Sequence, residues 1–105
     1  MAGIRQLSPQ DVSKALEKGT CDLVDVREAN EFAEARIPGA ILLPLSAFDP
    51  AVIPQAPGRL TVIACAAGGR SMKAAELCAQ AGHTVFNLTG GLAAWTKAGL
   101  PVERG

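Results

Sequence analysis

Apolar and polar residues follow one another along the chain in blocks that predict strands and helices in alternation. Four blocks are apolar and rich in β-branched side chains, which is typical of strands buried in a sheet. The blocks between them are rich in helix-forming residues. The predicted strands cover residues 22–26, 40–44, 60–65 and 84–88, and the predicted helices cover residues 28–35, 71–81 and 92–98 and a segment after Ser8.

This alternation predicts an α/β fold. A strand, a helix and a second strand in succession form a crossover unit whose two strands run parallel, and successive units place helices on both faces of the sheet. The segment at residues 40–44 is expected to be a brief buried strand that ends at Pro44. The segment at residues 60–65 is the strongest strand candidate.

Capping residues mark the ends of several predicted helices. Ser8 is placed as an N-cap, and Gly19 and Gly82 stand where helices stop in a left-handed conformation. Ser46 is expected to cap a further helical piece that runs through residue 48. Prolines and glycines interrupt residues 49–59 so often that this segment is predicted to be a loop.

The length and the charge balance narrow the possible functions. With 105 residues, the chain is expected to be a single domain, 1–105, built around one core. Ten basic and ten acidic residues cancel without forming blocks, which argues against nucleic-acid and membrane-surface binding. No segment is apolar for long enough to be a signal peptide or a membrane span, so we expect a cytoplasmic protein. No apolar stripe is left over for an interface, and a monomer is expected.

The cysteines and the single histidine favour neither a disulfide framework nor a metal site. Cys21, Cys65 and Cys78 are odd in number and lack CxxC spacing, and His83 has no second imidazole to share a metal ion. Cys78 is expected to fill the core, Cys21 to have no functional role, and His83 to lie in a turn away from any active site. We therefore expect no metal site.

Cys65 is the residue that points to chemistry. It ends the strand at residues 60–65, and ligands of open parallel sheets gather at the carboxyl ends of the strands. The segment 66–70, Ala-Ala-Gly-Gly-Arg, is predicted to be a loop, with the next helix opening at Ser71. Small residues and glycines let successive N–H groups converge on one anion, and the helix N-terminus and Arg70 add positive charge. We expect these groups to lower the pKa of the Cys65 thiol, as in other reactive cysteines.

Simpler structural roles are open for the same residues. Cys65 could be a buried structural cysteine followed by an ordinary glycine turn. Arg70 could contact a substrate anion, or it could fold back onto a carboxylate such as Glu76 or Asp25. Asp25 and Arg27 are expected to pair with each other, although they could also cap a helix or line the ligand site.

Two further features of the chain lie near its C-terminal end. The turn that begins at Thr89 is expected to start the last helix, with a wall of the substrate site as the alternative. Trp95, with Leu92 and Leu100, is expected to anchor that helix to the core.

Four motifs in this order resemble the rhodanese family of sulfurtransferases over nearly the whole chain. They are LVDVREANEF at 23–32, ARIPGAILLP at 35–44, VIACAAGGRS at 62–71 and LTGGLAAWTKAGLPVE at 88–103. The resemblance implies a three-layer α/β/α fold around a mainly parallel sheet of about five strands. Arg36 stands where many members have histidine, which is expected to change a structural hydrogen bond or the surface charge.

The resemblance also implies a reaction. Cys65 would take a sulfane sulfur from a small anionic donor such as thiosulfate and hold it as a persulfide. The backbone N–H groups of Ala66, Ala67, Gly68, Gly69 and Arg70 would bind that persulfide. The sulfur would then pass to a thiophilic acceptor, which is cyanide in an assay and a thiol or a protein in the cell. The resemblance implies that no cofactor is needed.

Other activities of the same fold remain as alternatives. A non-enzymatic persulfide carrier or a binding and regulatory module would share the fold, although modules of the latter kind usually lack the cysteine. Phosphatases and arsenate reductases of this architecture have a loop that is one residue longer than the four residues between Cys65 and Arg70. Ala66 and Ala67 bring no charge to the loop, which leaves room for a neutral or protein-bound donor.

Overall fold

A computed structural model describes residues 4–105. Its strands are β1 Arg5–Leu7, β2 Cys21–Asp25, β3 Ala35–Arg36, β4 Ile41–Leu42, β5 Leu60–Ala64, β6 Phe86–Leu88 and β7 Glu103–Arg104. Its helices are α1 Pro9–Glu17, α2 Ala29–Glu34, α3 Gly69–Gln80 and α4 Gly91–Lys97, with 3₁₀ turns η1 Leu45–Ala47 and η2 Pro50–Val52.

The central sheet has five strands in the order β1-β6-β5-β2-β4, and all of its pairs are parallel. The predicted mainly parallel α/β sheet is therefore confirmed. Because the strands are parallel, their carboxyl ends lie along one edge, which is where this class of fold holds its ligands. A separate antiparallel pair joins β3 to β7 and ties the C-terminal end to the segment after α2.

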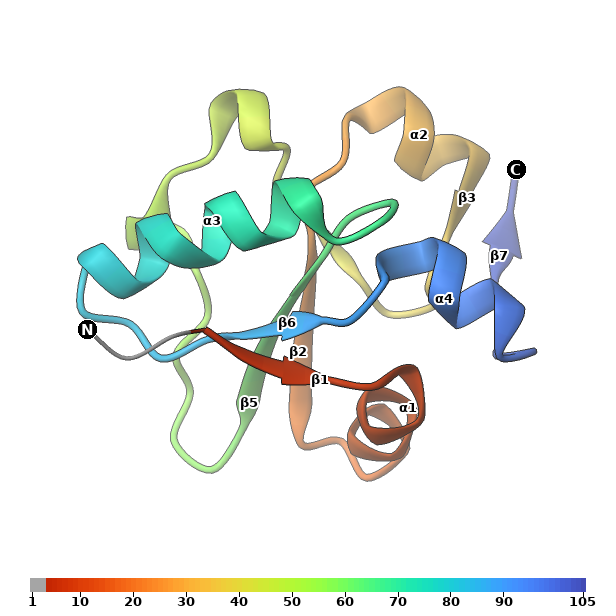
Figure 1. Cartoon of the computed structure of the whole chain (residues 1–105), viewed down its shortest axis with the longest axis horizontal. Coiled ribbons are helices and arrows are strands. Elements are labelled where there is room, and N and C mark those ends of the chain that lie inside the picture. Colours follow the sequence, from red (N-terminus) through yellow and green to blue (C-terminus); the bar gives the residue numbers. More distant parts are fainter. Residues whose placement is uncertain (1–3) are drawn as a thin grey trace.

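Helices cover both faces of the sheet, so the fold has three layers. Successive strand residues point to opposite faces: Leu23 joins the cluster that includes Trp95 of α4, and Val24 joins the cluster that includes Ala74 of α3. In Figure 1, α3 lies on one side of the strands and α1 on the other. Burying each large side chain of these clusters contributes about 1.5–3 kcal/mol, so the two clusters hold the layers together.

Local signals placed most elements correctly. The Ser8 side chain accepts a hydrogen bond from the Asp11 N–H at 3.1 Å and caps α1, as predicted. Gly19 and Gly82 both adopt the left-handed conformation after their helices. The segment at residues 49–59 is a loop that contains the short turn η2.

Two expectations about residues 40–48 are wrong. The strand β4 is not buried: it lies at the edge of the sheet, and Ile41 is 44% exposed because a neighbour covers only one side of the strand. Ser46 does not cap η1, because its hydroxyl donates to Glu28 Oε1 at 2.7 Å instead. The strand β1, which pairs with β6 far along the chain, was not among the predicted elements.

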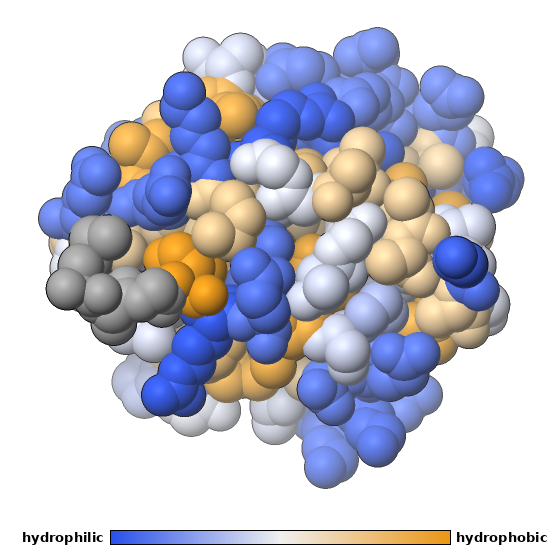
Figure 2. Space-filling model, in the orientation of Figure 1, coloured by the Kyte–Doolittle hydropathy of each residue, from blue (hydrophilic) through white to orange (hydrophobic). Residues whose placement is uncertain are grey.

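The surface of the described residues carries few large apolar side chains. Within residues 4–105, Ile41 and Val52 are the only large hydrophobic residues that are exposed. Figure 2 shows hydrophilic residues around the edge of one face, with apolar surface between them. No helix within residues 4–105 is long and apolar enough to cross a membrane.

Candidate active site

The thiol of Cys65 lies at the carboxyl edge of the central sheet, directly after β5. This strand is flanked by β2 and β6, so the cysteine stands in the middle of the sheet. The side chain is only 2% exposed. The position predicted for Cys65 is therefore the position that the structure shows.

A tight turn after Cys65 brings the N-terminus of α3 back to the sulfur. Gly68 has a φ of 106°, a left-handed conformation that side-chain-bearing residues resist, and it is the N-cap of α3. The helix starts at Gly69 and not at Ser71, because this conformation lets the chain turn into the helix two residues earlier than expected. Gly69 and Arg70 thus belong to the first helical turn, and Ala66 to Gly68 form the loop.

Two groups make hydrogen bonds to the sulfur. The Gly68 N–H donates to Cys65 Sγ at 2.9 Å. The Ser71 hydroxyl lies 3.3 Å from the same sulfur, where either atom can donate. Ser71 is itself fully buried, so water does not compete for this contact.

Hydrogen bonding lowers the pKa of Cys65 below its ordinary value. Burial of the thiol acts in the opposite direction and raises the pKa. The Ser71 hydroxyl and the backbone N–H groups of Ser71, Gly68 and Ala67 outweigh it, because each stabilises the thiolate. Among the N–H groups of residues 66–70 that were expected to converge on the sulfur, that of Gly68 forms a hydrogen bond to it at 2.9 Å. The roles expected of Ala66, Gly69 and Arg70 stay predictions.

A second helix N-terminus holds the loop in place. The N–H groups of Leu92 and Ala93, at the start of α4, donate to the carbonyl groups of Cys65 at 2.8 Å and Ala66 at 3.0 Å. A Cβ at Gly91 would lie 2.3 Å from Cys65 O, so only glycine permits this approach. The turn before α4 therefore clamps the main chain of the loop. Thr89, which was expected to start α4, donates its hydroxyl to Gln6 instead.

The arginines beside the loop are both paired with carboxylates. Arg70 donates to both carboxylate oxygens of Glu31, at 2.7 and 2.9 Å. It folds back as one expectation had it, but onto Glu31 of α2 and not onto Glu76 or Asp25. Arg27 and Asp25 form a buried pair at 2.8 Å, and their expected pairing is present.

The other candidates take the places expected of them. Cys78 is fully buried in α3 and Cys21 begins β2, and burial raises the pKa of each thiol to about 11. Trp95 is buried and donates its indole N–H to Pro101 O at 2.7 Å. Arg36 packs over the Phe32 ring and pairs with Glu103.

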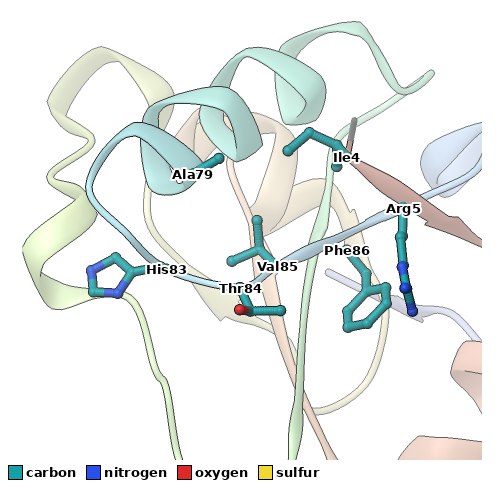
Figure 3. Close-up of a pocket in the computed structure, with 7 residues that line it drawn as sticks. All are labelled: Ile4, Arg5, Ala79, His83, Thr84, Val85 and Phe86. Atoms are coloured by element: carbon teal, nitrogen blue, oxygen red, sulfur yellow. The ribbon is translucent and has the colours of Figure 1, made fainter. Parts of the chain in front are cut away.

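A cavity lies at the opposite end of β6 from Cys65. It is lined by Ile4, Arg5, Ala79, His83, Thr84, Val85 and Phe86. Figure 3 shows the apolar side chains of Ile4, Ala79 and Val85 between His83 and Arg5. Within residues 4–105 no cluster of three or more histidine, cysteine or acidic side chains could hold a metal ion.

Two residues of the site were not identified from the sequence. Ser71 had been assigned only the start of a helix, and Asn87 only a place in a strand. The Ser71 hydroxyl lies 2.5 Å from Asn87 Oδ1, and Asn87 is 2% exposed. A polar residue in a short apolar strand was the one signal that could have drawn attention to Asn87.

Replacing Ser71 with alanine is expected to raise the pKa of Cys65 by about one unit, which is the worth of a hydrogen bond to a charged group. The thiolate fraction at neutral pH then falls, and alkylation of Cys65 slows. The pH dependence of iodoacetamide labelling, followed by peptide mass spectrometry, measures this change. Ser46→Ala removes the same hydroxyl from a site that does not touch Cys65 and should leave the profile unaltered. An unshifted profile in Ser71→Ala would contradict the assigned role of the hydroxyl.

Comparison with known proteins places the geometry in context. The family model of the rhodanese-like domain matches residues 8–98. A sulfurtransferase of Allochromatium vinosum is 38% identical over 81 residues, covering 76% of each chain. An uncharacterised protein of Synechocystis is 40% identical over 99 residues, which cover 93% of this chain and 55% of that relative. The chain thus spans about half the length of that relative.

The crystal structure of a thiosulfate sulfurtransferase from Pseudomonas aeruginosa superposes with a TM-score of 0.86 at 27% identity, covering 97% of this chain and 20% of that one.

Proposed function

Because this chain belongs to the rhodanese-like domain family, we propose that it is a sulfurtransferase that carries sulfur as a persulfide on Cys65. Relatives named as sulfurtransferases support the general activity. We further propose that the chain acts as one rhodanese domain in the cytoplasm, where its three free cysteines would stay reduced. No step of the proposed reaction requires a cofactor.

The reaction consists of two displacements at sulfur. The Cys65 thiolate attacks the sulfane sulfur of the donor and forms an S–S bond. The bond between this sulfur and the rest of the donor breaks, and the leaving group, sulfite in the case of thiosulfate, departs with the electron pair. An acceptor thiolate or cyanide then attacks the outer sulfur of the persulfide, and Cys65 leaves as a thiolate again. This scheme implies ping-pong kinetics.

The observation that carries the proposal is the pair of hydrogen-bonding groups at Cys65 Sγ. The Gly68 N–H and the Ser71 hydroxyl lie within 2.9 and 3.3 Å of the sulfur. Donors held in place by a helix N-terminus stabilise an anion without further reorganisation, as in oxyanion holes. The Gly68 N–H serves the thiolate as it stands, and the Ser71 hydroxyl can do so when its proton points to the sulfur. The neighbouring loop N–H groups are candidates to bind the persulfide.

The ion pairs beside the loop bear on the choice of donor. Arg70 is paired with Glu31. The hydrogen bonds from Arg70 are the main cause that lowers the pKa of Glu31 to about 2, and the hydrogen bond from the Glu28 backbone is the next. Glu31 is therefore ionised throughout the neutral range, and the charge of Arg70 is balanced. Ala66 and Ala67 are uncharged as well, so residues 66–70 offer no unpaired cation to a dianion such as thiosulfate. This favours a persulfide on a thiol or a protein as the cellular donor.

Replacing Glu31 with glutamine is expected to lower the KM for thiosulfate by about two- to fivefold, the worth of one partly exposed charge. Arg70 then carries a free positive charge, and glutamine can still complete the capping box at Glu28. Steady-state rates with thiosulfate and cyanide measure the effect. Glu34→Gln removes the same charge from the exposed end of α2 and should leave KM unchanged. An equal fall of KM in both variants would show that overall charge, and not the release of Arg70, is responsible.

The proposed function is tested by intact mass spectrometry and by two assays. Treatment with thiosulfate, or with a small persulfide, is expected to add one sulfur atom to the chain, and cyanide should remove it as thiocyanate. Sulfur loading without turnover to cyanide or thiols would indicate a persulfide carrier. Absence of loading, or activity on a generic phosphate ester alone, would reject the sulfurtransferase proposal in favour of a binding module or a phosphatase.

A further inference from the structure

A chain of polar side chains runs from the sulfur of Cys65 to the edge of the sheet. Ser71 of α3 contacts Cys65 Sγ at 3.3 Å, Gly68 O at 3.2 Å and, at the shortest distance, Asn87 Oδ1 at 2.5 Å. Asn87 of β6 donates its Nδ2–H to Gln6 Oε1 at 2.9 Å. Gln6 of β1 lies opposite Asn87 in the register of the two strands. Ser71 and Asn87 are buried, whereas Gln6 is exposed.

The single proton of the Ser71 hydroxyl decides which state of the thiol this arrangement fits. Asn87 Oδ1 carries no proton, so at 2.5 Å the Ser71 proton must lie between the two oxygens. The Ser71 oxygen then presents a lone pair to Cys65 Sγ. The described arrangement therefore fits a neutral thiol that donates to Ser71.

When Cys65 ionises, Ser71 must donate a hydrogen bond to the sulfur and can no longer accept one from it. A thiolate needs a donor, so the Ser71 hydroxyl must turn its proton from Asn87 to the sulfur. The Ser71 oxygen and Asn87 Oδ1 would then face each other at 2.5 Å with no proton between them. Rotation of the Asn87 amide by half a turn removes this conflict, because the Nδ2–H group then donates to Ser71.

Gln6 can follow the same rotation. After it, Asn87 Oδ1 faces Gln6, and Gln6 must present its Nε2–H group in place of Oε1. Its present Nε2–H contact is with Met72 Sδ, a weak acceptor, at 3.2 Å. Its other partner, the Thr89 hydroxyl, can accept a hydrogen bond as readily as it donates one at present. The exchange therefore costs little, and every buried group keeps a partner.

We propose that Asn87 and Gln6 are positioning residues whose side-chain amides rotate together each time Cys65 ionises, so that Ser71 donates to the thiolate while Asn87 donates to Ser71. The thiol proton leaves to solvent, and no other bond is made or broken. The pair acts through Ser71 and touches neither the sulfur nor a substrate. Ionisation alone drives the exchange, so its test does not depend on sulfur transfer.

The charged groups around the loop do not provide an alternative route for this coupling. Arg70 interacts electrostatically with both Cys65 and Asp25, but it is paired with Glu31, and Asp25 is paired with Arg27. The strands β5 and β6 contain no charged residue, and α4 carries only Lys97 at its last position. Besides Arg70, α3 carries Lys73 and Glu76, and β1 carries Arg5; all three are exposed. The polar chain through Ser71 is thus separate from the ion pairs.

Gln6→Glu tests the exchange because a carboxylate can only accept a hydrogen bond. It holds Asn87 with Nδ2 toward residue 6 and Oδ1 toward Ser71, which is the arrangement of the neutral thiol. The pKa of Cys65 is expected to rise by about half a unit, a fraction of the worth of a hydrogen bond to a charged group. Labelling with iodoacetamide as a function of pH measures this shift at Cys65.

Three comparisons separate the exchange from simple charge repulsion. The shift should persist in about 1 M salt, where charges are screened beyond about 3 Å, and it should vanish in a Ser71→Ala background, where the connection is cut. Gln10→Glu, which adds the same charge at an exposed position of α1, should produce no shift. A shift that disappears in salt, or that is equal with and without Ser71, would overturn the proposal.

Nuclear magnetic resonance can observe the rotation directly in the unmodified chain. Between about pH 3.5 and about pH 8.5, which spans the lowered pKa values of reactive thiols and that of free cysteine, the Asn87 side-chain NH₂ protons should move from proximity to Gln6 to proximity to Ser71. The midpoint should equal the pKa of Cys65, and Cys65→Ala should show no transition. Unchanged proximities of these protons while Cys65 ionises would reject the exchange even if the variants behaved as expected.

Discussion

Cys65→Ser is expected to abolish sulfur loading and to reduce sulfur transfer by at least about a thousandfold, since loss of a covalent nucleophile removes most of an enzyme's rate enhancement. A serine hydroxyl ionises far outside the neutral range, and its oxygen cannot form a persulfide. The fold should be retained, because oxygen replaces sulfur at the end of a strand whose main chain is held by Leu92 and Ala93.

Intact mass after donor treatment and the thiocyanate assay measure this loss, and thermal unfolding checks the fold. The matched control is Cys21→Ala, which removes a thiol at the other end of the sheet. Burial raises the pKa of Cys21 to about 11, so this thiol is protonated at neutral pH and does not compete for sulfur. Sulfur that still loads in Cys65→Ser, or loading that is lost in Cys21→Ala, would show that the carrier is a different thiol.

Arg27→Met is expected to lower the free energy of unfolding by about 3–5 kcal/mol, because it leaves one member of a buried ion pair without its partner. Asp25 and Arg27 are each 4% exposed. The Arg27 guanidinium donates to both Asp25 oxygens and to Ala35 O at 2.7 Å, so it also joins the end of β2 to the segment after α2. Loss of Arg27 leaves the Asp25 carboxylate buried without a partner. It also removes the hydrogen bond that joins the end of β2 to Ala35.

Chemical denaturation of the variants measures the loss. The double variant Asp25→Leu/Arg27→Met should recover much of it, because removing both members leaves no buried charge. Arg59→Met is a useful control: Arg59 pairs with Asp22 at 2.8 Å on the surface, where a salt bridge contributes only about 0–1 kcal/mol. Equal losses in Arg27→Met and Arg59→Met would mean that burial does not determine the worth of the Asp25–Arg27 pair.

Elements with strong local signals could be predicted from the sequence. Ser8 and Gly19 delimit α1, and the apolar segment before Cys65 is β5. The strand β1 could not be predicted, because its three residues are mostly exposed and it exists only through pairing with β6. The pair β3–β7 was also missed, because each strand has only two residues and forms only by pairing with the other.

The candidate site divides in a similar way. The place of Cys65 and the glycine turn after it follow from local sequence, because both depend on a few consecutive residues. The partner of Arg70 does not, since Glu31 lies 39 residues away and is brought near by the packing of α2. The start of α3 was placed two residues late, because the left-handed conformation of Gly68 was known only as a possibility.

Short-range properties were thus determined by the sequence alone: the order of strands and helices, the cysteine at a strand end, and the small residues that free the loop N–H groups. Tertiary structure alone decided which side chains meet, namely Ser71 with Cys65 and Asn87, Gly91 against the loop, and Glu31 with Arg70. The physical reason is that backbone preferences act within a few residues of the chain, whereas hydrogen bonds and ion pairs depend on distances of a few ångströms. The packing of distant elements sets those distances.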